Sequence, residues 1–172
     1  MRILGIDPGT ARCGWGVIDV SEKDGQLSWV AHGCIETDKL KAASERLNRI
    51  FNDIMSLIDK FQPYQVAIEL VFIFHNQKTA MKIAEARGVI LLACAKKGLA
   101  LQTFEYTPPQ VKMAVTGYGR SEKKEVWEEV IKALKPGRNI SSSKKDGFDD
   151  AADALALAIA HYHKYINEGI KS

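Results

Sequence analysis

Two acidic residues stand where apolar strands are expected to end, a position from which a carboxylate can bind a cation. Asp7 follows the apolar residues 2–6 and precedes Pro8-Gly9, which turn the chain away and expose the aspartate. Glu69 comes directly after Val66-Ala67-Ile68. A charge in a mostly apolar strand is costly to bury unless it is paired or binds a metal ion. Two such strand ends side by side would make a cation site, although Asp7 alone could cap a turn and Glu69 alone could form an internal salt bridge.

A second group of acids lies near the C-terminus. Asp150 and Asp153 are three residues apart and share one face of a helix, whereas Asp149 and Asp153 are four apart and nearly share it. The residues around them are small and apolar, namely Ala151, Ala152, Ala154, Leu155, Ala156 and Leu157. Such a helix can pack closely on a sheet and hold its carboxylates near whatever the sheet presents. The alternative is that Asp149 and Asp150 only favour the positive end of the helix dipole.

Carboxylate oxygens without a framework of cysteine or histidine suit Mg²⁺ or Mn²⁺ rather than zinc. The two groups of acids therefore predict a site for one of these cations.

Charge is distributed unevenly along the chain, although the net charge is only +3. Residues 76–145 contain 14 Lys and Arg against 6 Asp and Glu, while the remainder contains 10 against 15. A basic segment and an acidic segment in one small chain favour a polyanion-binding surface beside a cation site. The alternative is that solvated lysines on helices make up the basic segment.

The length of 172 residues and an apolar content of 46% suit a single domain over residues 1–172. The longest apolar runs are well short of the ~20 residues that a membrane span requires. The first apolar stretch is interrupted at once by an aspartate and a proline, so it does not form a signal peptide. We therefore expect a soluble, cytoplasmic protein that does not enter a membrane.

Cysteine and histidine show no metal-ligand spacing. Cys13, Cys34 and Cys94 stand singly in apolar segments, and we expect them to be reduced core residues. His161 and His163 are two residues apart on a predicted helix, so they face apart, and we expect both at the surface.

The pattern of apolar residues predicts the elements that must position these side chains. Strands are expected over residues 2–6, 13–20, 27–35, 64–70 and 99–104, with an Asp24-Gly25 turn joining the second to the third. Helices are expected over residues 47–61, 76–97, 107–115, 121–134 and 149–165. Strands first in a meander and then alternating with helices predict an α/β fold, a mixed sheet flanked by helices. The order of the strands does not follow from this pattern.

Several motifs, in order along the chain, resemble those of RuvC-type resolvases. They are Ile3-Leu4-Gly5-Ile6-Asp7-Pro8-Gly9-Thr10 with Gly14 and Gly16, Ala67-Ile68-Glu69 with Val71-Phe72, Ala86-Arg87-Gly88, Gln110-Val111-Lys112, Gly117-Tyr118-Gly119, and Asp150-Ala151-Ala152-Asp153-Ala154. The resemblance implies a ribonuclease H-like fold with a five-stranded sheet. It also implies a homodimer that makes paired nicks across four-way (Holliday) DNA junctions in recombination and repair, beside the RuvA and RuvB branch-migration proteins.

The resemblance also implies roles for particular residues. The four catalytic, metal-binding carboxylates of the family correspond to Asp7, Glu69, Asp150 and Asp153. Hydrolysis of a phosphodiester needs an activated water, charge neutralisation on the phosphate and a stabilised leaving oxygen, and two cations roughly 4 Å apart can supply all three. For that reaction we assign Asp7 to a bridge between two ions, Glu69 to one ion and the two acids of the helix to the other, and no side chain is needed as the nucleophile. Basic positions near the DNA correspond to Lys112 and Lys123, and an aromatic residue that contacts junction bases corresponds to Phe72. The additional acid Asp149 departs from the simplest form of the motif, so either Asp149 or Asp150 could be the partner of Asp153.

Three other functions fit part of the pattern. A nuclease of the same fold could act on RNA/DNA hybrids or branched duplexes, because the carboxylates alone do not set the substrate. The ATP-binding lobe of an actin-like or sugar-kinase fold also begins with Asp and Gly after a strand, but a chain of this length would lack the partner lobe. A non-catalytic junction-binding module would be expected to have lost one of the acids.

Overall fold

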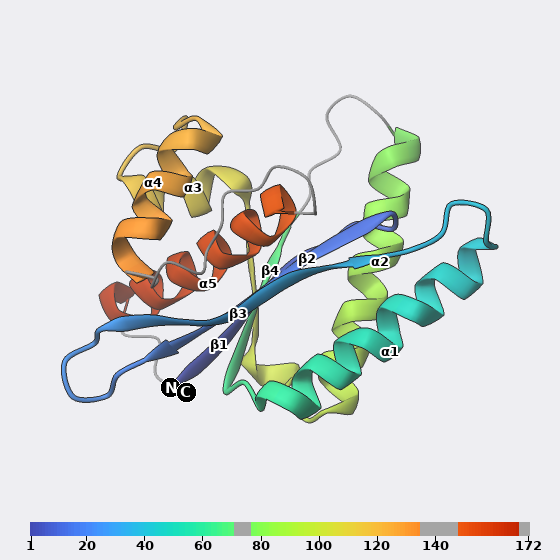
Figure 1. Cartoon of the computed structure of the whole chain (residues 1–172), viewed down its shortest axis with the longest axis horizontal. Helices are drawn as coiled ribbons and strands as arrows, with labels where there is room; N and C mark the ends of the chain where they lie inside the picture. Colours follow the sequence, from blue (N-terminus) through green and yellow to red (C-terminus); the bar gives the residue numbers. More distant parts are fainter. Residues whose placement is uncertain (71–76, 135–147, 169–172) are drawn as a thin grey trace.

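The computed structural model describes residues 1–70, 77–134 and 148–168, which form five strands and five α-helices (Figure 1). The strands are β1 (Arg2–Asp7), β2 (Arg12–Val20), β3 (Leu27–Glu36), β4 (Gln65–Glu69) and β5 (Thr103–Tyr106). The helices are α1 (Ala43–Phe61), α2 (Gln77–Lys96), α3 (Pro108–Thr116), α4 (Lys123–Leu134) and α5 (Phe148–Glu168), and a single 3₁₀ turn covers Ala100–Gln102.

The strands form one sheet in the order β3-β2-β1-β4-β5. β1 pairs with β2 and β2 with β3 in antiparallel register, which is the predicted meander. β1 pairs with β4 and β4 with β5 in parallel register. The predicted mixed five-stranded sheet flanked by helices is therefore confirmed. Because β1 and β4 are parallel neighbours, their carboxyl ends lie at the same edge of the sheet.

Helices cover both faces of this sheet (Figure 1). Successive residues of a strand point to opposite faces, so Ile3 packs in the core beneath α3, α4 and α5, while Leu4 packs beneath α1 and α2. Helix α1 buries one apolar stripe, which consists of Ile50, Ile54, Ile58 and Phe61. Complete burial of one isoleucine stabilises the fold by about 1.5–3 kcal/mol, so both layers hold the sheet firmly.

The strand predicted over residues 99–104 is wrong in position. Helix α2 is followed by Gly98 with a positive φ of 77°, and the chain then makes the 3₁₀ turn before β5 begins at Thr103. Pairing with β4 starts only there, where Thr103 lies opposite Val66. The apolar residues before it are not strand residues, and Leu101 is 89% exposed.

The surface position expected for His161 is also wrong, because its side chain is completely buried beneath the sheet. Its Nε2–H donates to Gln65 Oε1 over 2.9 Å, and its Nδ1 accepts the Tyr106 hydroxyl over 2.6 Å. These two bonds offset the cost of burying the ring, and burial lowers the pKa of His161 to about 4. The imidazole is therefore neutral and ties α5 to two strands. His163 is half-buried.

The expectation for cysteine holds in part: Cys13 and Cys94 are buried free thiols, whereas Cys34 is only half-buried. Within the described ranges, no helix is long and apolar enough to cross a membrane.

Candidate active site

The first two predicted carboxylates lie side by side at the edge of the sheet. In the parallel pairing of β1 with β4, Ile6 lies opposite Ile68, and the next residues along the two strands are Asp7 and Glu69. Asp7 is the last residue of its strand because Pro8 has no backbone N–H with which to continue the pairing. The parallel topology thus brings together two acids that are 62 positions apart in the numbering.

Helix α5 brings the other two carboxylates over the same edge. Glycines in β1 and β2 allow this close approach: a Cβ on Gly14 would lie 2.1 Å from the Asp150 carbonyl oxygen, and one on Gly5 would lie 1.9 Å from that of Ala154. Any side chain at these positions would push the helix off the sheet. The glycines that appeared in the sequence only as part of a motif therefore determine how near Asp150 and Asp153 come to Asp7.

The electrostatics of Asp7 identify these carboxylates as one site. Burial, and then the charges of Glu69, Asp153 and Asp150, together raise the pKa of Asp7 to about 8. The pKa of Glu69 is also raised, first by burial and then by the charge of Asp153. A hydrogen bond between the two carboxyl groups also raises the pKa of Asp7 and lowers that of Glu69, which favours a proton on Asp7. The proton relieves the repulsion between negative charges that a bound cation would otherwise relieve.

Two basic side chains neutralise the acids of α5. Lys123, at the start of α4, places Nζ 2.7 Å from Asp153 Oδ2, and this hydrogen bond raises the pKa of the lysine. Arg12, at the start of β2, donates from Nε to Asp150 Oδ2 over 2.7 Å. Lys123 was predicted as a basic residue near DNA, but its contact with an acid of the site was not predicted. Nothing in the sequence signalled Arg12, which lies 138 residues from its partner.

These pairings bear on the fit of a metal ion. The residues contributed by the sheet and α5 are all carboxylates, the oxygen donors that Mg²⁺ and Mn²⁺ prefer. Their mutual repulsion, expressed in the pKa of Asp7, also suits a cation. Over the described ranges, however, no three or more His, Cys, Asp or Glu side chains are already arranged as a ligand set. We attribute this to the ion pair of Asp153, whose carboxylate would have to exchange Lys123 for a metal ion.

The remaining predicted residues are placed as follows. Asp149 is exposed at the start of α5, and no ion pair of it is recorded among the described residues. Lys112 is half-buried on α3, and in the described part of the chain no hydrogen bond or ion pair joins its side chain to the four carboxylates. Phe72 lies outside the described residues.

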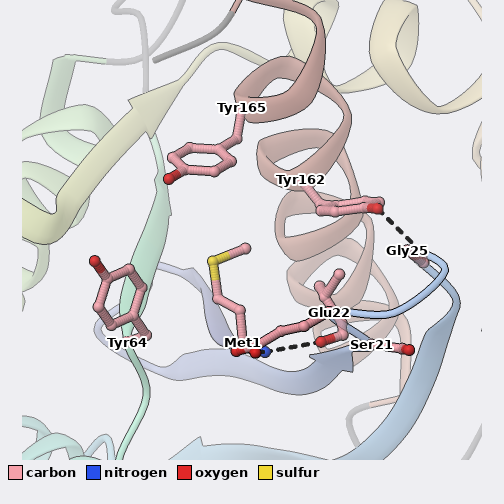
Figure 2. A pocket seen from close by; sticks show the side chains of 8 residues that line it. Met1, Ser21, Glu22, Gly25, Tyr64, Tyr162 and Tyr165 are labelled. Carbon is pink, nitrogen blue, oxygen red and sulfur yellow. Dashed lines mark hydrogen bonds and ion pairs between the residues drawn. The ribbon is translucent and has the colours of Figure 1, made fainter. Parts of the chain in front are cut away.

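A cavity of about 530 Å³ lies at the opposite end of the sheet, where β1 begins. Figure 2 shows its lining, in which Tyr64, Tyr162 and Tyr165 surround Met1. None of the four carboxylates lines it, so this cavity is separate from the candidate active site.

The chain is similar along nearly its whole length to proteins of one family. The family profile described as crossover junction endodeoxyribonuclease RuvC matches residues 3–161. The RuvC of Thermotoga petrophila is 44% identical over 161 residues, which cover 94% of this chain and 92% of that protein. The RuvC of Finegoldia magna is 42% identical over 172 residues, which cover 98% and 99%.

A solved structure agrees with this similarity. Thermus thermophilus RuvC in complex with a Holliday junction substrate superimposes with a TM-score of 0.84 and 31% sequence identity, over 98% of this chain and 96% of that one. The fold is that of the ribonuclease H-like resolvases, as the sequence motifs implied.

Proposed function

The chain belongs to the RuvC family of crossover junction endodeoxyribonucleases, and from this premise we propose that it resolves four-way DNA junctions by metal-dependent hydrolysis. The products are paired symmetric nicks made during homologous recombination and DNA repair. The observation that carries the proposal is the convergence of four carboxylates at one edge of the sheet, where parallel pairing brings Asp7 beside Glu69 and α5 packs directly on glycine. Their mutual repulsion contributes to the raised pKa of Asp7. Such a repulsive cluster destabilises the protein unless it serves to bind a cation.

We assign Asp7, Glu69, Asp150 and Asp153 to the binding of divalent cations. Bound Mg²⁺ or Mn²⁺, with two ions in each site, would neutralise charge on the scissile phosphate and lower the pKa of the attacking water. The protein itself contributes rigidity, since Asp7 and Glu69 end two paired strands and the other two acids belong to a helix packed directly on glycine. If Asp153 held a cation, Lys123 would be released from this ion pair and could contact the DNA backbone.

Cleavage of labelled substrates tests the proposal. A four-way junction, a linear duplex and an RNA/DNA hybrid are incubated with the protein, each with and without Mg²⁺. We expect cutting of the junction alone, and only with the metal. Equal cutting of all three substrates would contradict junction resolution, and cutting in EDTA would contradict the metal site. The Asp7→Asn variant should bind the junction without cutting it, because it removes a metal ligand but leaves the basic surface intact.

We assign DNA contacts to Lys112, Lys123 and Phe72. The excess of positive charge in residues 76–145 supports this assignment, because phosphate contacts by lysine release counterions and strengthen binding. Junction affinity should therefore fall steeply with added salt. A flat plot of log affinity against log salt concentration would contradict a basic binding surface.

We further propose that the protein is a homodimer, because paired nicks require two active sites. An apolar stripe on α2 supports the assembly: Met81 is 62% exposed and Leu92 is 52% exposed, and Ala84 and Gly88 lie exposed on the same helix face. A Cβ on Gly88 would meet nothing within 4 Å. The stripe can accept a second copy closely at this glycine.

Gly88 provides a clean test of the dimer. Gly88→Arg has room in the single chain and should leave the chain folded, because arginine favours a helix over glycine by roughly 1 kcal/mol. In the dimer, the same side chain would separate the two copies. We expect light scattering to report a dimer for the wild type and a monomer for Gly88→Arg. Glu128→Arg, on an exposed position of α4 across the sheet, serves as the control. A monomeric wild type would contradict the assembly.

The RuvA and RuvB branch-migration proteins are the partners that family membership suggests, and the cytoplasm is the compartment where they would meet the junction. A pull-down of RuvA and RuvB from a mixture with junction DNA, with and without this protein, tests the partnership.

A further inference from the structure

The two oxygens of Asp150 have different surroundings. Oδ2 accepts the Arg12 Nε–H over 2.7 Å and also lies 3.9 Å from the Cys34 Sγ. Within the described part of the chain, Oδ1 has no hydrogen-bond partner. One oxygen of this carboxylate is therefore fixed by the sheet, and the other remains open to a cation.

Arg12 is itself held in place, although its side chain is 42% exposed. It begins β2 and lies opposite Glu36 of β3 in the strand register. Its Nη1 is 3.8 Å from Glu36 Oε1, while its Nε faces Asp150. The guanidinium thus lies between two carboxylates and contacts each with a different nitrogen, which fixes its orientation better than a single contact would.

We propose that Arg12 is a positioning residue of the metal site: its Nε–H holds Asp150 Oδ2 so that Oδ1 is presented to the cation. This inference rests on the proposed function, since it concerns the same site. Carboxylates that bind a metal are commonly oriented by a hydrogen bond to the oxygen that does not bind it, and loss of such a partner lowers metal affinity by roughly 10–100-fold.

A positive charge near a cation site also repels the cation, so two effects of Arg12 oppose each other. The repulsion is small here because the guanidinium is partly exposed to water and because Glu36 and Asp150 offset its charge. Orientation of Asp150 should therefore outweigh repulsion.

Two substitutions separate these effects. In Arg12→Gln, the amide Nε2 occupies the same place along the side chain as the arginine Nε, so the donor to Asp150 is kept and the charge is removed. In Arg12→Ala, both are lost. The matched control is Arg49→Ala on α1, which removes an exposed arginine whose ion pair, at 2.5 Å, is with Asp53 and not with an acid of the site.

The measurement is Mn²⁺ binding by calorimetry without DNA, together with the Mn²⁺ dependence of junction cleavage. We expect Arg12→Ala to weaken Mn²⁺ binding by about 10-fold and to raise the half-saturating Mn²⁺ concentration equally, with the cleavage rate largely recovered at saturating metal. Arg12→Gln should stay close to the wild type, as should Arg49→Ala. Circular dichroism melts confirm that each variant is folded.

Three results would overturn the inference while leaving the proposed function intact. Equal or tighter Mn²⁺ binding by Arg12→Ala would show that repulsion dominates. Equal impairment of the Gln and Ala variants would assign the effect to charge and not to the Nε–H. A loss confined to junction affinity would make Arg12 a phosphate contact. Failure of the proposed function is distinguishable, because it would appear in the wild type as absence of Mn²⁺ binding and of cleavage.

Discussion

Asp7→Asn should stabilise the metal-free protein while abolishing its activity. Burial and three neighbouring carboxylates raise the pKa of Asp7 from 3.8 to about 8. Between these values, the folded protein binds a proton that the unfolded chain releases. Because this acid has a raised pKa in the folded state, its contribution to stability is complete below about pH 4 and is lost as the pH rises through about 8. Asparagine has a similar shape and does not ionise.

The magnitude follows from the pKa. One pKa unit corresponds to about 1.4 kcal/mol, so an aspartate that ionises near pH 8 instead of near 4 would cost up to about 4 kcal/mol at pH 7. Glu69 shares the proton and therefore part of this cost, which leaves about 2–4 kcal/mol to be recovered by Asp7→Asn. For a chain of this length, that gain corresponds to a rise in melting temperature of roughly 5–12 °C.

The assay is thermal unfolding in EDTA at pH values from 5 to about 8.5. This range covers most of the pH values between the ordinary and the raised pKa of Asp7 over which the folded protein keeps a proton that the unfolded chain loses. The wild type should lose stability across the window, whereas Asp7→Asn should lose much less. With Mn²⁺ in place of EDTA, the melting temperature of the wild type should rise but that of Asp7→Asn should not. Glu128→Gln, at an exposed position on α4, is the control and should follow the wild type. A variant that melts at or below the wild-type temperature at pH 7, or that shows the same pH dependence, would refute the reasoning.

Further substitutions test other parts of the site. Asp150→Asn should slow cleavage by more than the roughly 100-fold that loss of an outer hydrogen-bond partner costs, while Asp149→Asn should stay near the wild-type rate. If Asp149→Asn were the more severe of the two folded variants, the choice of Asp150 as the partner of Asp153 would be contradicted. Lys123→Ala should slow cleavage by roughly 100-fold at saturating junction, whereas its exposed neighbour Lys124→Ala should not, and equal effects would deny Lys123 a special role. Phe72→Ala should cut an intact junction slowly and a junction with mismatches at the crossover at a recovered rate, because stacking on an unpaired base contributes about 1–3 kcal/mol. Wild-type cutting of the intact junction by this variant, or loss of its melting transition, would contradict a stacking role for Phe72.

The sequence by itself determined the elements and the chemistry of the site. Asp7 and Glu69 could be recognised because local signals, an apolar strand before each acid and Pro8 after the first, are contained within a few residues. The spacing of Asp150 and Asp153 likewise fixed their common helix face. These features depend on backbone geometry over a single turn or strand, and the motifs that resemble RuvC-type resolvases added the fold and the substrate.

Only the tertiary structure decided how these elements meet. The parallel pairing of β1 with β4 brings Asp7 to Glu69, and the order of strands has no signal in hydrophobic periodicity. His161 was expected at the surface because helical spacing cannot reveal Gln65, which is 96 residues away and satisfies its ring.

The same reason applies to the cations of the site. Arg12 lies 138 residues from Asp150, and Lys123 lies 30 residues from Asp153. An ion pair between distant residues depends on the packing of α5 and α4 against the sheet, because charge attraction in water is too weak to specify a partner along the sequence. The close packing of α5 on the glycines of the sheet therefore decided which basic residues form ion pairs with the carboxylates. The identity of the acids alone could not decide this.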